Sequence, residues 1–176
     1  DGELDVDSLR HAARIIFIAQ DILVGNADYP TSAIGDTSRR FRQLGLGFTN
    51  LGASLMAQGL AYDSAPGRAW AGAVTALLSG EAYATSADLA ERLGAFAGFD
   101  ENRQPMQDVL RRHRAALAHI GEQAPVPLVE AARERWDHAV KGCERQGVRN
   151  AQATVIAPTG TISFMMGLRA TAIRDA

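Results

Sequence analysis

The residues best suited to chemistry lie near the end of the chain, in the segment Pro158-Thr159-Gly160-Thr161-Ile162-Ser163. Here a glycine stands between hydroxyl-bearing residues directly after a short apolar stretch, 153–157, and a helix is expected to continue through Met166. Such a turn can present backbone N–H groups and hydroxyls at a helix start, where phosphate binds without a lysine. The same residues also suit a plain strand-to-helix turn capped by serine and threonine. The motif alone leaves both interpretations open.

Cysteine and histidine offer little further chemistry. Cys143 is the only cysteine, so the chain has no internal disulfide or thiol pair, and the sequence predicts an incidental, partly buried thiol. His113 and His119 are six residues apart, which does not align them on one helix face as a spacing of three or four would. The sequence therefore predicts no metal site and places the histidines on solvated helix surfaces (His11, His113, His119 and His138).

Two groups of arginines remain. The first, Arg111, Arg112 and Arg114, is typical of an exposed helix face. The second group, which lies between residues 39 and 42, fits either an anion or the carboxylates of a partner (Arg39, Arg40 and Arg42). A solvated or salt-bridged surface is favoured for this group as well.

The composition limits the class of protein. The chain has 176 residues, of which 47% are hydrophobic and 22% charged, in the range of ordinary globular proteins. A net charge of -2 and a pI near 6.1 argue against binding to nucleic acid or to a membrane surface. No apolar run approaches the roughly 20 residues that span a bilayer, and the acidic start, 1–7, does not resemble a signal peptide. The sequence predicts one soluble, cytoplasmic domain over residues 1–176.

Helical periodicity dominates the chain. It predicts helices over about 8–24, 51–58, 66–93, 106–120 and 127–146, with Asp7 capping the first and Pro66 in the first turn of the third. Only the apolar, β-branched stretch 153–157 is typical of a strand, and it has no obvious partner. Glycines between 45 and 52 indicate either close backbone contacts or an irregular helix start (Gly45, Gly47 and Gly52). The predicted fold class is mainly α, with one or very few short strands.

The first predicted helix is unusual because apolar side chains cover most of its circumference. Ile15, Phe17, Ile18, Ile22 and Leu23 widen the stripe that the helical spacing already defines. A helix of this kind is usually buried on several sides. We therefore expect it to have neighbours on more than one face.

Three segments, in order and spacing, resemble parts of the large catalytic chain of ribonucleotide reductases. Residues 150–163 (NAQATVIAPTGTIS) resemble its substrate phosphate-binding segment. Residues 42–48 (RQLGLGF), with Leu51-Gly52, Leu55-Met56 and Tyr62-Asp63-Ser64, resemble its glycine-rich helix and turn. Residues 19–24 (AQDILV) and 26–30 (NADYP) are similar to the vitamin B12-dependent branch in particular.

The resemblance implies a fold and a reaction. The chain would be a C-terminal part of a ten-stranded α/β barrel, in an enzyme that replaces the ribose 2′-hydroxyl with hydrogen. That enzyme uses a cysteine thiyl radical generated from adenosylcobalamin. By motif match, five residues would hold the substrate phosphates through backbone N–H and hydroxyl groups (Thr159, Gly160, Thr161, Ile162 and Ser163). That role positions substrate and neutralises its charge, and it breaks no bond.

The same resemblance also shows what this chain lacks. The family's radical cysteine and its two reducing cysteines lie outside the resembled segment, and Cys143 matches none of them. Residues 167–176 keep little of the family pattern beyond Thr171 and Ile173. Both ends fit cuts through a longer chain. We therefore expect a fragment that is inactive alone, binds no cobalamin itself and binds nucleotide weakly. The alternative is a non-catalytic helical interaction module that associates with itself or with a missing reductase segment.

Overall fold

The computed structural model describes residues 4–165, and helices form most of them. This confirms the mainly helical fold class. The helices are α1 (Val6–Asn26), α2 (Ser32–Phe41), α3 (Leu51–Ala57), α4 (Ala65–Leu93), α5 (Arg103–Ala116), α6 (Val126–Arg145) and α7 (Gly160–Met165), with short 3-10 turns at Asp100–Asn102 and Leu117–His119. None of the described helices is both long enough and apolar enough to cross a membrane.

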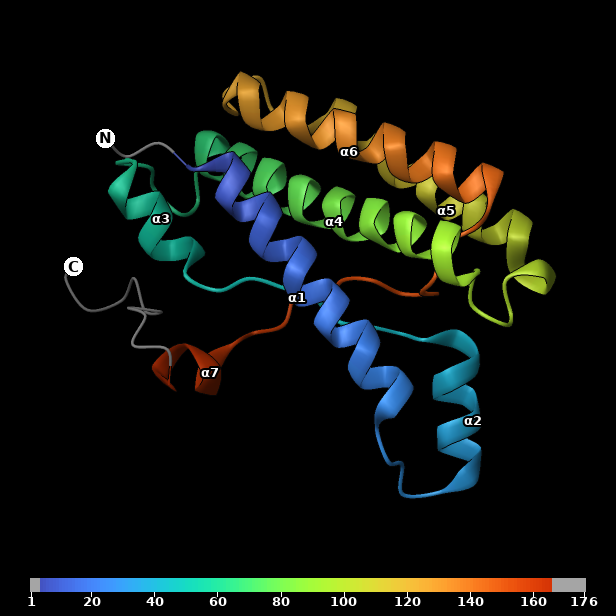
Figure 1. The fold of residues 1–176 in the computed structure, drawn as a ribbon. Coiled ribbons are helices and arrows are strands. Elements are labelled where there is room, and N and C mark those ends of the chain that lie inside the picture. The colour runs from blue at the N-terminus through green and yellow to red at the C-terminus, as the bar shows by residue number, and fades with distance from the viewer. Residues whose placement is uncertain (1–3, 166–176) are drawn as a thin grey trace.

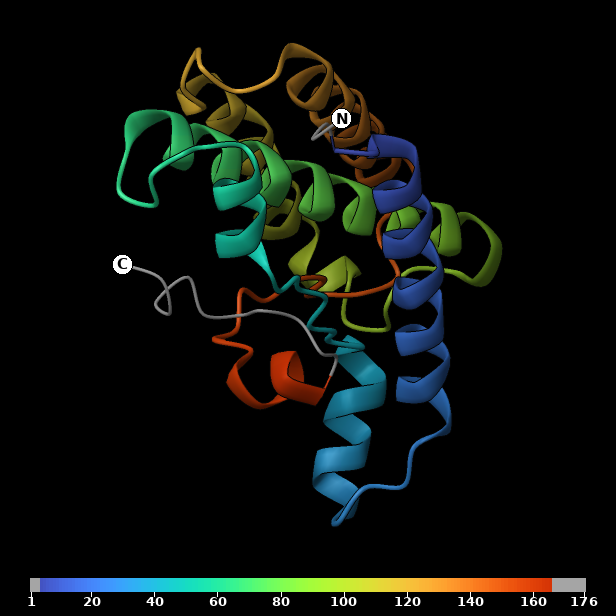
Figure 2. The ribbon, with the colours of Figure 1, turned by 90° about the vertical axis from the view of Figure 1, so that its left-hand side faces the viewer.

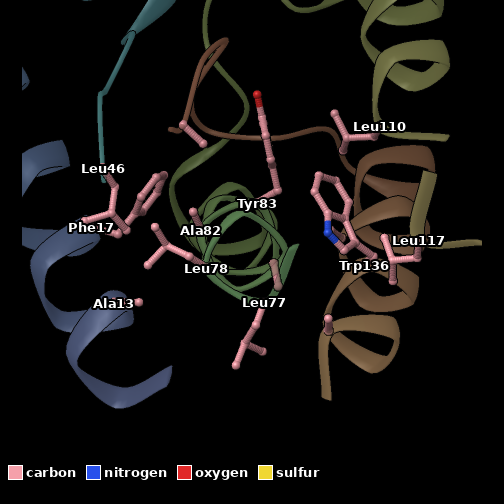
Figure 3. Close-up of a cluster of buried hydrophobic side chains, with 14 of the residues drawn as sticks. Ala13, Phe17, Leu46, Leu77, Leu78, Ala82, Tyr83, Leu110, Leu117 and Trp136 are labelled. Carbon is pink, nitrogen blue, oxygen red and sulfur yellow. The ribbon is translucent and has the colours of Figure 1, made fainter. Parts of the chain in front are cut away.

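Helix α4 is the centre of the molecule. It packs against α1 on one side and α6 on the other, while α5 packs on α6 (Figure 1). Seen along its axis, α4 directs Leu78 and Ala82 towards Phe17 of α1 and lies against Trp136 of α6 (Figure 3). This apolar packing explains why α4 is buried along much of its length. Both views place α2 and α7 at the end of the molecule away from α6 (Figure 2).

Helix starts follow the local sequence signals. The Ser64 hydroxyl accepts the Gly67 N–H at 3.0 Å at the start of α4, and Pro66 occupies the first turn as predicted. For α1 the predicted cap, Asp7, was wrong. The cap is Asp5, whose carboxylate accepts the Ser8 N–H at 2.9 Å, because the helix begins two residues earlier than the apolar pattern indicates.

Helix α2 is an element that the periodicity did not predict. The Thr31 hydroxyl caps it by accepting the Ile34 N–H at 3.3 Å. Its sequence, SAIGDTSRRF, has few apolar residues, so no hydrophobic stripe marks it. It ends at Arg42, whose φ of 48° is left-handed. The N-cap threonine was the one local signal for this helix.

The predicted strand 153–157 is reduced to one parallel β-bridge between Leu46 and Thr154. Its partner is the glycine-containing segment around Leu46, which the sequence left as a close contact or an irregular helix start. The backbone N–H of Leu46 donates to the Ala153 carbonyl at 3.0 Å, and that of Val155 donates to the Leu46 carbonyl at 2.9 Å. A Cβ at Gly47 would lie 2.4 Å from the Val155 carbonyl oxygen. The close-contact interpretation is therefore confirmed at this position.

Helix α1 is apolar on two opposite faces, but only one of them is covered. Phe17 is fully buried against the core. On the other face, four large apolar side chains are at least half exposed (Ile15, Ile16, Ile22 and Leu23). The expectation of neighbours on several sides is therefore met on only one face within the described residues.

Candidate functional site

The predicted phosphate-binding residues form the start of α7. Thr159 precedes the helix with a left-handed φ of 56°, and its Oγ1 lies 3.2 Å from the Thr49 hydroxyl and 2.8 Å from the Pro158 carbonyl oxygen. The first helical hydrogen bond is donated by the Ser163 N–H to the Thr159 carbonyl at 3.1 Å. The N–H groups of Thr161 and Ile162 come before that bond in the chain. Like the first N–H groups of any helix, they have no carbonyl partner within the helix.

The five predicted residues differ in exposure. Gly160, Thr161 and Ile162 are exposed, and among residues 4–165 no atom from outside this turn lies within 4 Å of the position that a Cβ would take at Gly160. Thr159 is half-buried against Thr49. Ser163 is buried, with its hydroxyl donating to the Gly160 carbonyl at 2.8 Å. The backbone and hydroxyl of residues 160–162 are therefore open to solvent, while the Ser163 hydroxyl holds the turn.

A buried polar cluster, which sequence reasoning missed, lies where the chain segment that leads to α7 begins. Asp21 of α1, Arg42 after α2, Ser86 of α4 and Asn150 are each 8% exposed or less. Asp21 Oδ1 accepts hydrogen bonds from Arg42 Nε and from Asn150 Nδ2, both at 2.8 Å. Ser86 Oγ donates to Asn150 Oδ1 at 2.8 Å. We call these four residues the Asp21–Asn150 cluster.

The three arginines between 39 and 42 separate in the structure. Arg40 pairs with Glu101 at 2.6 Å on the surface, and the Arg39 guanidinium lies 5.2 Å above the ring centre of Tyr29. Both agree with the predicted surface role. Arg42 does not, because it is buried with Asp21. The prediction that Arg42 lies on the protein surface was therefore wrong.

A groove of about 830 Å³ lies between α4, the turn after α5 and the segment Thr154–Ile156. Small residues of α4 such as Gly72 and Ala76 form its floor, and Trp136 lines one side. None of the residues from 159 to 163 lines it. The groove and the start of α7 are therefore separate features.

The cysteine and the possible metal ligands of the described residues can now be located. Cys143 is fully buried in α6, and burial raises the pKa of its thiol to about 11. The predicted incidental thiol is thus more deeply buried than expected. Within residues 4–165, no three His, Cys, Asp or Glu side chains gather as metal ligands. Because a radical-forming thiol must reach both cofactor and substrate, the one thiol here does not fit adenosylcobalamin chemistry. Residues 167–176, which depart from the family pattern, lie outside the described part.

Comparison with known proteins places this chain in a family. The family model described as the barrel domain of ribonucleotide reductase matches residues 1–173, and this chain belongs to that family. It is 52% identical over 173 residues to a vitamin B12-dependent ribonucleotide reductase of Rhodopirellula baltica, and 44% identical over 171 residues to one of Streptomyces avermitilis. It is also 29% identical over 170 residues to a vitamin B12-dependent ribonucleoside-diphosphate reductase of Mycobacterium tuberculosis.

These matches cover nearly all of this chain but little of the relatives. They include 98%, 96% and 97% of the chain, which spans only 17%, 18% and 19% of the three relatives' lengths. The resemblance drawn from the three sequence motifs is thereby confirmed at the level of the family. The activity of the complete relatives belongs to proteins more than five times as long.

Proposed function

We propose that this chain supplies the substrate-phosphate-binding part of a vitamin B12-dependent ribonucleotide reductase, with Thr159–Ser163 as the binding residues. The observation that carries the proposal is the start of α7, where residues 160–162 are exposed and Thr159 is held against Thr49. The relatives from Rhodopirellula baltica and Streptomyces avermitilis are both named vitamin B12-dependent ribonucleotide reductases. A cytoplasmic location, where nucleotides are made and used, accompanies this function.

In this proposal the chain binds and orients but does not reduce. Backbone N–H groups and the Thr161 hydroxyl donate to phosphate oxygens, which positions the nucleotide and offsets its charge. Complete reductases of this kind use adenosylcobalamin to generate the radical that starts reduction. The cysteines for that chemistry belong to other segments of a reductase, since Cys143 is buried away from any ligand. The isolated chain is therefore inactive alone.

Calorimetric titration with ribonucleoside di- and triphosphates tests the binding site. We expect weak, saturable binding that Thr159→Ala/Thr161→Ala abolishes. Thr37→Ala, which removes an exposed hydroxyl on α2, is the matched control and should leave the affinity unchanged. Binding that survives the double substitution would rule out these residues. Deoxynucleotide formed by the chain with adenosylcobalamin and a dithiol would overturn its inactivity.

A second candidate function is a helical interaction module, favoured by the exposed apolar stripe on α1. The four side chains repeat at a spacing of seven residues, so they fill two adjacent positions of two heptads, and none carries charge. Two heptads offer much less than the roughly 800 Å² per partner typical of a stable dimer. The occupant we propose is therefore a helix of the remaining reductase polypeptide, because the chain spans only 17% of its Rhodopirellula baltica relative.

Sedimentation distinguishes these occupants. The chain should sediment as a monomer alone and form a complex with the remainder of the Rhodopirellula baltica protein. Ile22→Glu should weaken that complex, whereas Ala115→Glu, which adds the same charge at an exposed position on α5 outside the stripe, should not. Self-association of the chain at micromolar concentration would contradict the choice of occupant.

A further inference from the structure

Two extended segments connect the Asp21–Asn150 cluster with the start of α7. The first runs from Phe41 to Thr49 and the second from Asn150 to Thr159. Backbone hydrogen bonds join residues 41–46 to residues 151–155: Ala151 N–H to the Phe41 carbonyl at 2.9 Å, Leu44 N–H to the Gln152 carbonyl at 2.9 Å, and the two bonds around Leu46. At the far end, the Thr159 hydroxyl meets that of Thr49 at 3.2 Å. The position of the first segment therefore determines the position of the second.

Asn150 makes four hydrogen bonds in this arrangement and is fully buried. Its side-chain Nδ2 donates to Asp21 Oδ1 at 2.8 Å and to the Arg42 carbonyl at 3.0 Å. Its Oδ1 and its backbone N–H both meet the Ser86 hydroxyl, at 2.8 and 3.0 Å. Each polar group that an asparagine side chain offers thus has a partner. The side chain joins α1, α4 and both extended segments at one point.

Arg42 completes the cluster from the other segment. Its guanidinium donates to Asp21 through Nε at 2.8 Å and through a terminal nitrogen to the Asp21 carbonyl at 2.6 Å. Arg42 also has a left-handed backbone, which is uncommon for a residue with a side chain. Glycine is the usual residue there, but it would lack the guanidinium that neutralises Asp21. The buried ion pair therefore keeps the chain in the turn from which the first segment starts.

We infer that Asn150 is a positioning residue for the phosphate-binding segment. It fixes the alignment of residues 150–159 on residues 41–49, and through that alignment it fixes Thr159 and the start of α7. The inference rests on the proposed function for the claim that the segment binds phosphate. The claim that Asn150 positions the segment rests on the hydrogen bonds alone. Apolar packing alone does not fix the alignment as far as Thr159, because Ala153 is buried but Val155 and Ile156 beyond it are exposed. Hydrogen bonds of Asn150 to fixed partners on α1 and α4 provide the selection.

The test compares three variants of the whole chain. Asn150→Asp places a second carboxylate 2.8 Å from Asp21 and removes the amide donor. Asp21→Asn/Asn150→Asp restores one amide and one carboxylate across the same contact and keeps the net charge of the wild type. Leu110→Ala is the matched control, since it removes a fully buried side chain between α5 and α6, away from both segments. All measurements are made well below each variant's melting temperature.

Cytidine diphosphate is the probe for binding. Asn150→Asp should weaken its affinity at least tenfold in folded protein. The exchanged pair should recover part of that loss, because it restores the contact with residue 21 but not the hydrogen bond to the Arg42 carbonyl. Leu110→Ala should lower the melting temperature without changing the affinity. A purely structural role for Asn150 predicts the opposite: Asn150→Asp and Leu110→Ala both lower the melting temperature and both bind normally. That result would overturn the inference.

Amide hydrogen exchange separates this inference from the proposed function. If the wild type binds no cytidine diphosphate, the proposed function fails for the isolated chain, and exchange alone decides the inference. Asn150→Asp should then expose the amides of Leu44, Leu46 and Val155 while α4 and α6 stay protected. Uniform loss of protection, as in Leu110→Ala, would refute the positioning role. If Asn150→Asp does not fold, the milder Ser86→Ala takes its place with the same expected pattern.

Discussion

The indole ring of Trp136 lies directly on Gly80, where a Cβ would be 2.9 Å from the ring carbon Cδ1. The same ring donates its N–H to the Ala76 carbonyl at 2.9 Å. Because α4 has no side chain at Gly80, Trp136 of α6 packs in the core directly against the backbone of α4. Figure 3 shows Trp136 beside α4. Gly72, another glycine of α4, has no contact as close as this one.

Because of this contact, alanine substitutions at Gly80 and Gly72 should change the stability of the fold in opposite directions. Gly80→Ala should lower the free energy of unfolding by about 1–3 kcal/mol, because the added methyl overpacks the core. Gly72→Ala should raise it by about 0.5–1 kcal/mol, because the nearest atom is 3.9 Å away and alanine favours the helix. Urea unfolding followed by circular dichroism measures both. Equal destabilisation by the two substitutions would contradict the packing.

Glu81 is a buried carboxylate between two arginines. Arg10 Nε lies 3.1 Å and Arg135 Nε 3.0 Å from its Oε2, and the Glu81 side chain is 5% exposed. Glu81→Ala should cost about 3–5 kcal/mol, because Arg135 would keep a buried charge without its main partner. The control is Glu101→Ala, which breaks an exposed pair with Arg40 and should cost under about 1 kcal/mol. Chemical denaturation compares them, and a small effect at Glu81 would refute the buried pair.

Asp88 gives the stability of the fold a pH dependence. Burial raises the pKa of Asp88, but hydrogen bonds from Arg14 and His138 outweigh burial, so the pKa falls below its ordinary value of 3.8. The folded state therefore favours the carboxylate, and the resulting stability is present above about pH 4 and lost as pH falls through the folded pKa. Asp88→Asn should be destabilising at pH 7 and progressively less so below pH 4. Denaturation at several pH values checks this, and a pH-independent difference would contradict it.

Cys143 should be inert in the native protein. With a pKa of about 11, only about one thiol in a thousand is ionised at pH 8, and the sulfur is fully buried. An aromatic disulfide reagent should label it only after denaturant is added. Stoichiometric labelling of native protein within minutes would show an accessible thiol and would reopen a redox role for it.

Local signals in the sequence predicted the long helices well. The helix predicted over 66–93 is α4, because Ser64, Pro66 and a long apolar pattern agree with one another. The helix predicted over 127–146 is α6 for similar reasons. Helix α2 could not be found in the same way, since its ten residues carry little apolar pattern. The single-domain assignment over residues 1–176 stays a prediction.

The site was predicted only in part. The residues from Thr159 to Ser163 were selected by motif, and their role in binding phosphate stays a prediction. The Asp21–Asn150 cluster was missed because its four residues come from distant segments of the chain and have no shared periodicity. Sequence patterns assign polar residues of a helix to the solvent-facing side. That assignment is wrong for a buried polar side chain whose hydrogen bonds are made to other protein groups and not to water. An acidic residue on the apolar first helix, Asp21, was the available signal.

The bridge between Leu46 and Thr154 has a consequence for the order of folding. Its two residues are 108 positions apart, and α3, α4, α5 and α6 all lie between them in the chain. Contacts across such a separation form slowly, because the intervening loop must close first. We expect α4 and α6 to dock early and the two extended segments to meet only afterwards. Residues 150–159 would then be placed last in folding and released first when the protein begins to open.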